Sequence, residues 1–407
     1  MSHIKTVPGG VTAAKGFLAA GVHCGIRKNK EKRDLGMIFC ETPCAAAAVY
    51  TQNLVKGAPI LVTKQHLENG TAQAVIVNSG NANTCNADGV EKAQSMCRLA
   101  ADALHIDVKD VIVASTGVIG QVLPIEPIEA AVGGLAAALS REGSSDAAEA
   151  IMTTDTVKKE VAVSVSLGGK EVKIGGIAKG SGMIHPNMAT LLGFLTTDAA
   201  ISAALLQKAL LAAVEQSFNM ISVDGDTSTN DTVAVMASGL AENALIETEN
   251  GDYQLFCEAL TAVCRSLAKR LAGDGEGATK LLICKVTGAK SAKDAKLVSK
   301  SVVCSSLVKA AMFGADANWG RVLCAIGYSG AEAAIDKVDV SMQSGKGTIA
   351  VCQNGAGVLF SEEKAKEILL EKEITILVTL KDGDAEAEAY GCDLTYDYVK
   401  INGDYRT

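Results

Sequence analysis

Short runs of branched and aliphatic residues alternate along this chain with longer segments rich in alanine and leucine at helical spacing. The short branched and aliphatic runs are typical of strands, and the longer amphipathic segments are typical of helices that cover a sheet. Their alternation predicts an α/β fold. The expected strands are Ala74–Asn78, Val111–Ser115, Val161–Leu167 and Ile374–Leu380, and the expected helices are Val90–Leu104, Ile128–Leu139, Ile201–Phe218, Tyr253–Leu271 and Ser305–Phe313.

Several of these elements end in polar turns that contain glycine. NSGNANTC comes after Val77, STGVIG after Ala114, DGDTSTND after Val223, and GDGEGATK after the helix expected at Tyr253–Leu271. Sites in α/β proteins usually form at strand ends, because backbone N–H groups are free there. We therefore expect these turns to contribute to a site.

Two of the turns have the composition of known ligand loops but not their spacing. GDGEGATK lacks the GxxxxGK[ST] pattern of a phosphate loop and precedes an expected strand rather than a helix. DGDTSTND has acidic residues spaced faintly like those of a calcium loop, but it lacks the glycine and the terminal glutamate in register. Neither motif predicts a nucleotide or a metal ion.

The length of the chain favours more than one structural unit. A chain of 407 residues is too long for one ordinary core, and 48% hydrophobic residues allow a sizeable one. The segment Gly288–Lys300, with the sequence GAKSAKDAKLVSK, is rich in small and charged residues, as at a boundary or a crossover. We expect a main α/β domain over residues 1–287 and a smaller α/β domain over residues 288–407.

Composition and charge exclude several classes of partner. The formal net charge is −8 and the charges are spread along the chain, so we expect no nucleic-acid partner. The one basic run, IRKNKEKR at residues 26–33, is best interpreted as a solvated loop.

The sequence has no run of membrane-spanning length and no apolar segment of signal-peptide type near its start. We expect a soluble, cytoplasmic protein.

The twelve cysteines do not form the paired CxxC units of a metal or disulfide scaffold. Several of them lie among Val, Leu, Ile or Ala, as reduced thiols in a core do, which implies a reducing compartment. These are Cys257, Cys284, Cys304, Cys324 and Cys352. Cys40 and Cys44 are imaginable as metal ligands, but none of the five histidines has ligand spacing to them, so no metal is expected.

The stretch KGSGMIHPNMATLLGF, residues 179–194, places Ala189 and Thr190 between a glycine-containing loop and an apolar run. Thr190 could simply begin a strand. Alternatively, its hydroxyl could attack the Ala189 carbonyl, and hydrolysis of the resulting ester would release a chain that begins with threonine. The new α-amine, with a pKa of about 7.7–8.0, would then serve as the base for its own hydroxyl. Gly180 and Gly182 would permit the strained geometry of such a shift.

Further blocks occur in a fixed order along nearly the whole chain. They are DLGMIFCE, NSGNANTC, ASTGVIG, TTDTVKKE, IAKGSGMIHPNMATLLGF, VDGDTSTNDTV, AGDGEGATK, ADANWGR and DYVKINGDYRT. Taken together, they resemble the ornithine acetyltransferase family, also called the glutamate N-acetyltransferase family of arginine biosynthesis. The resemblance implies a layered αββα-type sandwich core with a smaller C-terminal α/β domain.

The resemblance also implies roles for individual residues. The chain is expected to cleave itself between Ala189 and Thr190, after which Thr190 is the nucleophile and Thr116 and Gly117 form the oxyanion hole. The expected substrate-binding residues are Thr154, Lys179, Thr190, Glu276, Asn402 and Thr407. In that role Lys179 could neutralise a substrate carboxylate and Glu276 could bind the amine of ornithine, although each residue alone could equally be a surface or turn residue.

The activity implied is ping-pong transfer of an acetyl group from N2-acetylornithine to glutamate through acetyl-Thr190, without a metal or organic cofactor. Some members of the family also accept acetyl-CoA as donor. The fragments 1–189 and 190–407 are expected to stay associated in a heterotetramer of two α and two β chains, with His185 and Pro186 shaping the bond that is cleaved. The alternatives are an N-terminal-threonine amidase or aminopeptidase, and a non-catalytic protein that binds a small molecule.

Overall fold

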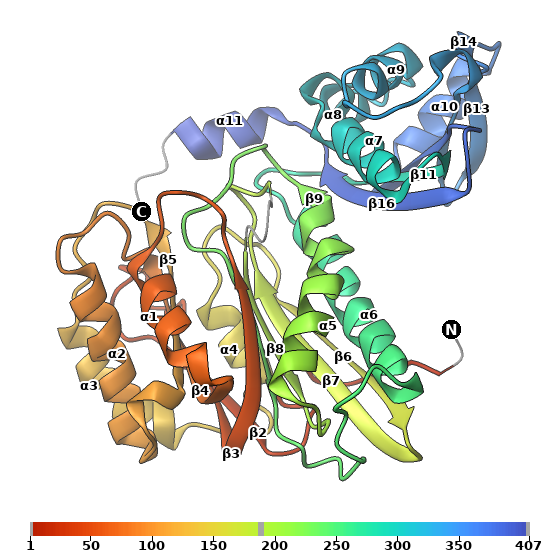
Figure 1. Cartoon of the computed structure of the whole chain (residues 1–407). Coiled ribbons are helices and arrows are strands. Elements are labelled where there is room, and N and C mark those ends of the chain that lie inside the picture. The colour runs from red at the N-terminus through yellow and green to blue at the C-terminus, as the bar shows by residue number, and fades with distance from the viewer. Residues whose placement is uncertain (1–2, 186–190, 404–407) are drawn as a thin grey trace.

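The computed structural model describes residues 3–185 and 191–403, which form a large layered body and a smaller lobe made mostly of the last third of the chain (Figure 1). Each part is built on one mixed sheet, of nine and seven strands respectively. The predicted α/β class with a smaller C-terminal α/β part is therefore confirmed. Its prediction succeeded because the periodicity of the strands and helices is strong along the whole chain.

The large sheet has the strand order β1-β6-β7-β8-β10-β3-β4-β5, with β2 paired to β3. Its strands are β1 Lys5–Val7, β2 Phe17–Val22, β3 Leu35–Tyr50, β4 Thr71–Asn81, β5 Val111–Val118, β6 Lys159–Leu167, β7 Lys170–Lys179, β8 Leu192–Thr197 and β10 Thr232–Ala237. The helices around it are α1 Ala58–His66, α2 Gly89–Leu104, α3 Glu126–Ala137, α4 Ser144–Ala150, α5 Ala203–Glu215 and α6 Gly251–Gly273.

The long strand β3 divides this sheet into two halves. Its first part, from Leu35 to Phe39, pairs with both β2 and β4, and the register with β4 shifts between Phe39 and Cys44. Its last part, from Ala45 to Tyr50, pairs with β10. A shift of this kind bends a strand and increases its twist. The half formed by β2, β4 and β5 can therefore fold over the half formed by β6, β7, β8 and β10.

Alternation of apolar side chains shows that both halves are buried on both faces. On β10, Val233 and Val235 pack in the cluster that contains helices α5 and α6, whereas Ala234 and Met236 pack in the cluster between the two halves. Strand β4 behaves in the same way, with Ile76 packing in the cluster of helices α2 and α3. The layers therefore run helix, strand, strand, helix, and the expected sandwich is confirmed.

The smaller lobe is built on the order β14-β13-β12-β15-β11-β16-β9. Its strands are β9 Ile221–Ser222, β11 Leu281–Ala289, β12 Asp339–Ser344, β13 Gly347–Gln353, β14 Ala356–Gly357, β15 Glu373–Thr379 and β16 Ala385–Cys392. Its helices are α7 Ala292–Cys304, α8 Ser306–Phe313, α9 Trp319–Gly327 and α10 Glu362–Leu369, and α11 Tyr396–Gly403 follows the last strand. One-turn 3₁₀ helices lie at Leu67–Asn69, Val108–Asp110, Phe218–Met220 and Ile335–Lys337.

The domain boundary expected after residue 287 falls inside β11, which pairs with β15 from Leu281 onward. Most of the segment Gly288–Lys300, interpreted as a boundary or crossover, belongs to helix α7, whose N-cap Ser291 accepts a hydrogen bond from the Asp294 amide. On this helix Lys293 is exposed and Lys296 is half-buried, while Ala295 and Val298 are buried. Helix α7 belongs to the connection that leads from β11 to β12.

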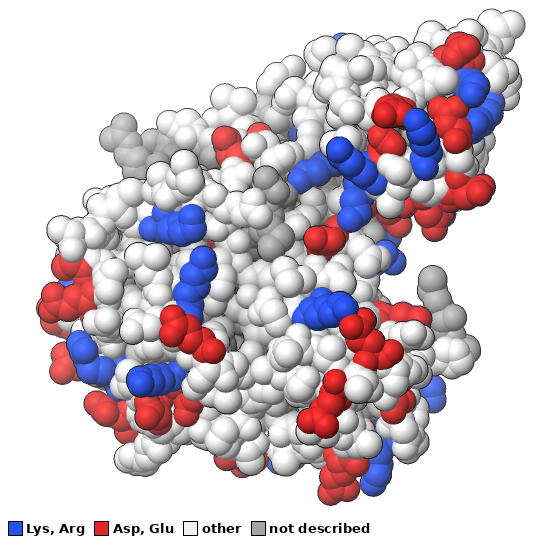
Figure 2. All heavy atoms as spheres, viewed as in Figure 1, with Lys and Arg blue, Asp and Glu red and all other residues white. Residues whose placement is uncertain are grey.

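Charged side chains of both signs are interspersed on the face of the molecule shown in Figure 2. Within residues 3–185 and 191–403, no helix combines the length and the apolar character needed to cross a bilayer.

Candidate active site

The ends of the parallel strands β4 and β5 form one wall of the candidate site. Both strands are longer than expected, because the segments NSGN and STGV are not turns but continue the pairing, with Ser79 opposite Thr116 and Gly80 opposite Gly117. Gly117 has a φ of 136°, and a Cβ atom there would lie 2.3 Å from the Gly80 carbonyl carbon. Only glycine fits this close approach of two backbones.

The structure brings six of the expected site residues to one cavity of about 130 Å³. Two come from the end of β5, and the others come from the loop before β6, the end of β7, the loop before β11 and helix α11. These residues are Thr116, Gly117, Thr154, Lys179, Glu276 and Asn402. Ala189, Thr190 and Thr407 lie outside the described residues. Strand β8 begins two residues after Thr190, at Leu192, which pairs with Lys179 of β7.

Lys179 and Thr116 are in direct contact inside this cavity. The Lys179 Nζ atom donates a hydrogen bond to the Thr116 Oγ1 atom at 3.3 Å, and both residues are buried. A hydroxyl that accepts from an ammonium group keeps its own hydrogen free to donate elsewhere. Thr116 can therefore present a polarised O–H donor to the cavity. Burial lowers the pKa of Lys179 below its ordinary value, although Asp155 opposes that change.

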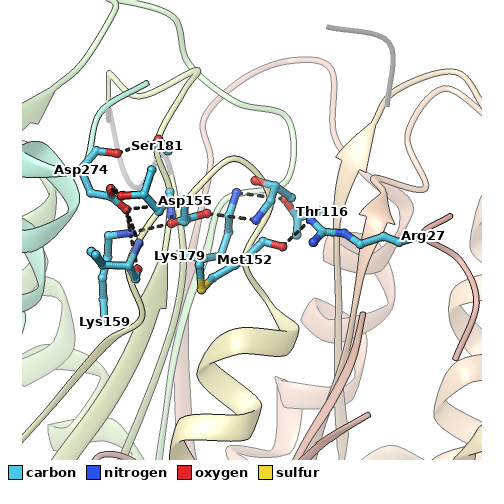
Figure 3. Close-up of polar contacts among 12 residues, drawn as sticks. Arg27, Thr116, Met152, Asp155, Lys159, Lys179, Ser181 and Asp274 are labelled. Carbon is cyan, nitrogen blue, oxygen red and sulfur yellow. Dashed lines mark hydrogen bonds and ion pairs between the residues drawn. The ribbon is translucent and has the colours of Figure 1, made fainter. Parts of the chain in front are cut away.

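A buried network of charges supports this wall of the cavity (Figure 3). The Lys159 Nζ atom lies 2.7 Å from Asp155 Oδ1 and 2.6 Å from Asp274 Oδ2, and the Lys159 side chain has no exposed surface. Asp155 also accepts from the amides of Gly180, at 2.7 Å, and Thr153, at 3.0 Å. These contacts tie the loop before β6 to the end of β7, so that both are held against the cavity.

The same network extends to Glu276. The Ser181 hydroxyl donates to the Asp274 carbonyl at 2.6 Å, and the Glu276 amide donates to the Ser181 carbonyl at 3.0 Å. Burial alone would raise the pKa of Asp155, but Lys159 and Lys179 beside it outweigh that effect and lower its pKa to about 2. Asp155 is therefore ionised at neutral pH.

Sequence reasoning assigned no role to the three residues of this network. Asp155 and Lys159 belong to the block TTDTVKKE, and Asp274 belongs to the block AGDGEGATK. The only available signal was their place in these blocks, because spacing in sequence does not show that Lys159 meets Asp274. The network positions the loops that carry Thr154, Lys179 and Glu276.

Replacing Lys159 by methionine should destabilise the fold strongly, because it leaves two buried carboxylates without their cation. We expect the free energy of unfolding to fall by ~3–5 kcal/mol, measured by urea denaturation at pH 7. The neighbouring Lys158 is exposed, so Lys158→Met should change that free energy by less than about 0.5 kcal/mol.

The pH dependence of this difference gives a second readout. Since Asp155 has a pKa of about 2 in the fold and about 3.9 when unfolded, the stabilisation is present above about pH 4 and is lost as the pH falls toward 2. The difference in free energy of unfolding between wild type and Lys159→Met should therefore shrink between about pH 4 and pH 2. A difference in free energy of unfolding that stays constant from pH 7 to pH 2 would show that the charge of Asp155 is not stabilised by Lys159.

Helix α11 reaches the cavity from the far end of the chain. The Asn402 Nδ2 atom donates to Glu276 Oε2 at 2.7 Å, and the Tyr398 hydroxyl donates to Asp224 Oδ2 at 3.3 Å. Just before the helix, the Thr395 hydroxyl donates to the Gly277 carbonyl at 2.7 Å. The segment before residue 404 is therefore anchored to two loops of the main body, and Asn402 and Glu276 form one polar pair.

The motif DGDTSTND connects segments that form the cavity. Asp224 accepts from the amides of Met183, at 2.7 Å, and Ile184, at 2.8 Å. At its other end, Asn230 donates to the carbonyls of Ala82, at 2.5 Å, and Ser115, at 2.9 Å. The motif therefore links the loop after β7 to the ends of β4 and β5.

His185 faces a different cavity, of about 600 Å³, and does not line the one formed around Lys179. Its Nδ1 atom lies 3.2 Å from the Ser222 hydroxyl, and burial, with help from nearby Lys300, lowers its pKa to about 4. A neutral imidazole that points elsewhere is unsuited to act as the base in the cavity. This agrees with a role in shaping the loop. Pro186 lies outside the described residues.

Metal ligation has no support in the part of the chain that the structure describes, where no three His, Cys, Asp or Glu side chains gather suitably. The thiol of Cys44 donates to the Thr42 carbonyl at 3.4 Å, and the thiol of Cys40 lies 3.7 Å from the Thr42 hydroxyl. These two cysteines are buried side chains of β3.

Comparison with known proteins gives concordant results. The model of the ArgJ family matches residues 18–407. The chain is 54% identical to the arginine biosynthesis bifunctional protein ArgJ of Symbiobacterium thermophilum, over 99% of this chain and 100% of the relative. It is 50% identical to the protein of the same name from Caldanaerobacter subterraneus subsp. tengcongensis, again over 99% and 100%.

Two solved structures are also similar. An arginine biosynthesis bifunctional protein ArgJ from Bacillus halodurans is 50% identical to this chain. The match covers 52% of this chain and 97% of that protein's chain, with a TM-score of 0.49. The ornithine acetyltransferase of Mycobacterium tuberculosis, crystallised with ornithine, is 39% identical to this chain. The match covers 46% of this chain and 100% of that protein's chain, with a TM-score of 0.43.

Proposed function

The chain belongs to the ArgJ family, and we propose that its acetyl transfer takes place in the cavity around Thr116 and Lys179, with Thr190 as nucleophile. The protein is a bifunctional acetyltransferase of arginine biosynthesis. It transfers acetyl groups from N2-acetylornithine to glutamate, and it also makes N-acetylglutamate as an amino-acid acetyltransferase. The observation that carries the assignment of the site is the meeting of six residues from five separate segments at one cavity.

The proposed mechanism begins with cleavage between Ala189 and Thr190, which gives Thr190 a free α-amine. That amine takes the proton of the Thr190 hydroxyl as the oxygen attacks the acetyl carbonyl. The Thr116 hydroxyl, polarised by Lys179, and the Gly117 amide then stabilise the oxyanion. Ornithine leaves with the proton, and glutamate takes the acetyl group from Thr190 by the reverse sequence.

The two charged ends of the cavity suit an amino-acid substrate. Glu276 is buried and accepts from Asn402, so its carboxylate is oriented to bind the side-chain ammonium group of ornithine. Lys179 supplies positive charge near the Thr116 hydroxyl, where the substrate carboxylate would lie. Thr154 contributes a hydroxyl to the lining, and Thr407 is proposed to complete it.

Replacing Glu276 by glutamine should weaken binding of acetylornithine selectively. The variant keeps a side-chain oxygen for Asn402 but removes the charge that pairs with the ammonium group, so we expect KM for acetylornithine to rise by about 10- to 100-fold. Glu258, an exposed residue of helix α6, provides the matched control Glu258→Gln, which should leave KM unchanged. Equal KM values in the two variants would remove Glu276 from the substrate site.

The two fragments are proposed to remain together after cleavage. Strand β7 precedes the cleavage site and β8 follows it, and they pair along six residues in the middle of the large sheet, from Ile174 opposite Thr197 to Lys179 opposite Leu192. Separation would break this pairing and expose both core faces. We propose the α and β fragments 1–189 and 190–407, paired as two α and two β chains in a reducing, cytoplasmic compartment. The smaller lobe lies entirely within the fragment 190–407.

A hydrolase with the same nucleophile is the nearest rival, since water in place of glutamate would release acetate. Incubation with acetylornithine, with and without glutamate, separates the two functions. We expect N-acetylglutamate to form and acetate to stay minor when glutamate is present. Equal acetate release in both mixtures would favour an amidase, and absence of any turnover of acetylornithine would favour a non-catalytic binding protein.

A further inference from the structure

A second and larger cavity, of about 420 Å³, adjoins the reaction cavity. The two share Gly117, Thr153 and Thr154 in their linings. Its volume lies within the range of sites that hold extended small molecules, about 300–1,000 Å³. Acetylornithine and glutamate are compact and have their charged partners in the smaller cavity. The larger one therefore has space for a donor that is longer than either amino acid.

The lining of this larger cavity is basic. Arg27, Lys28 and Lys32 contribute to it, and none of its described lining residues is acidic. All three belong to the run IRKNKEKR, which the sequence alone presented as a solvated loop. Lys28 and Lys32 are exposed, and among the described residues neither side chain forms an ion pair. Such cations attract phosphate groups.

Hydrogen bonds hold the first part of the loop that carries these residues. The fully buried Asp34 carboxylate accepts from the amides of Cys24, at 2.5 Å, Gly25, at 3.2 Å, and Arg27, at 2.8 Å. The Arg27 Nη2 atom also donates to the Met152 carbonyl at 2.6 Å, just before Thr153. The loop is therefore anchored to the segment that both cavities share. Lys179 and Thr116 lie between Arg27 and the Asp155 network (Figure 3).

We propose that this cavity binds the phosphate-bearing arm of acetyl-CoA, with Lys28 and Lys32 meeting the phosphates and the pantetheine arm passing Thr154 into the reaction cavity. The inference rests on the proposed function, because it uses the same nucleophile and oxyanion site. A phosphorylated thioester needs a basic cavity next to the reaction cavity, because its phosphates must be bound. An acetylated amino acid has no phosphates and needs no such cavity.

The transfer step balances with groups already assigned. The Thr190 oxygen bonds to the thioester carbonyl carbon, and the C–S bond breaks. The hydroxyl proton passes through the Thr190 α-amine to the departing sulfur, which leaves as the thiol of CoA. Glutamate then removes the acetyl group as in the exchange reaction, so both donors share one acetyl-enzyme.

The test compares three donors in three forms of the mature enzyme. The donors are acetyl-CoA, S-acetylpantetheine, which lacks the phosphates, and acetylornithine. The forms are wild type, the double variant Lys28→Glu and Lys32→Glu, and the control Lys30→Glu, whose lysine is exposed in the same loop but does not line the cavity. The readout is kcat/KM for N-acetylglutamate formation with each donor.

We expect the double variant to lose at least about tenfold in kcat/KM for acetyl-CoA relative to acetylornithine, with S-acetylpantetheine changed by less than about twofold. The control Lys30→Glu should keep the wild-type ratio. Equal losses for acetyl-CoA and S-acetylpantetheine, or equal effects of the double variant and the control, would overturn the inference while the exchange reaction stands. Failure of wild type to use acetylornithine would instead overturn the proposed function.

Discussion

Replacing Thr190 by alanine should leave the chain as one uncleaved polypeptide and lower acetyl transfer by at least about 10⁴-fold. The physical reason is that one hydroxyl serves two reactions. It attacks the Ala189 carbonyl during cleavage, and it later carries the acetyl group. A denaturing gel measures the first loss, and N-acetylglutamate formation from acetylornithine measures the second.

Two controls separate chemistry from folding in this experiment. Thr190→Ser keeps a hydroxyl and should retain measurable cleavage and transfer. Thr6→Ala removes an exposed threonine from β1 and should leave both reactions unchanged. Cleavage that continues in Thr190→Ala would place the reactive bond elsewhere in the chain.

Replacing Thr116 by valine should have the second largest effect. Valine keeps the shape of the side chain but removes the hydroxyl that Lys179 polarises from 3.3 Å. Because this hydroxyl acts on the charge that develops in the transition state, we expect kcat to fall by about 10²- to 10³-fold with little change in KM for acetylornithine. Steady-state kinetics on the cleaved enzyme measure both constants.

Thr116→Ser is the matched control, since it restores the hydroxyl on a smaller side chain. It should recover most of the lost kcat. If valine and serine lowered kcat equally, the methyl group of Thr116 would matter and its hydroxyl would not. A rise in KM without a fall in kcat would make Thr116 a substrate-binding residue and not an oxyanion donor.

The sequence predicted the α/β class and the approximate position of most elements, because alternation on the strands and helical spacing are local properties. Its errors arise where a local pattern has two structural meanings. The glycines after Val77 and Ala114 indicate turns, but in the fold Gly80 and Gly117 continue two strands that approach each other closely. The small and charged residues after Gly288 indicate a boundary or a crossover, and in the fold most of them belong to helix α7, in the connection between β11 and β12.

The site was predicted less completely than the fold, for a physical reason. Thr116, Lys179 and Glu276 were named from a resemblance, whereas their positions depend on contacts between distant segments. Lys159 meets Asp274 across more than a hundred residues, and no spacing rule links the two. The sequence presents residues 26–33 as a solvated loop, because a charge run is usually solvated. Only the fold places Lys28 and Lys32 beside the reaction cavity.

In the proposed mechanism Thr190, which cleavage makes N-terminal, carries the acetyl group. The most direct test mixes the enzyme with acetylornithine without glutamate, quenches the mixture in acid, and measures the intact masses of its fragments. We expect a fragment that begins at Thr190 and carries one acetyl group, which disappears when glutamate is added before the quench. An unbroken chain, or an acetyl group on any other residue, would contradict this mechanism.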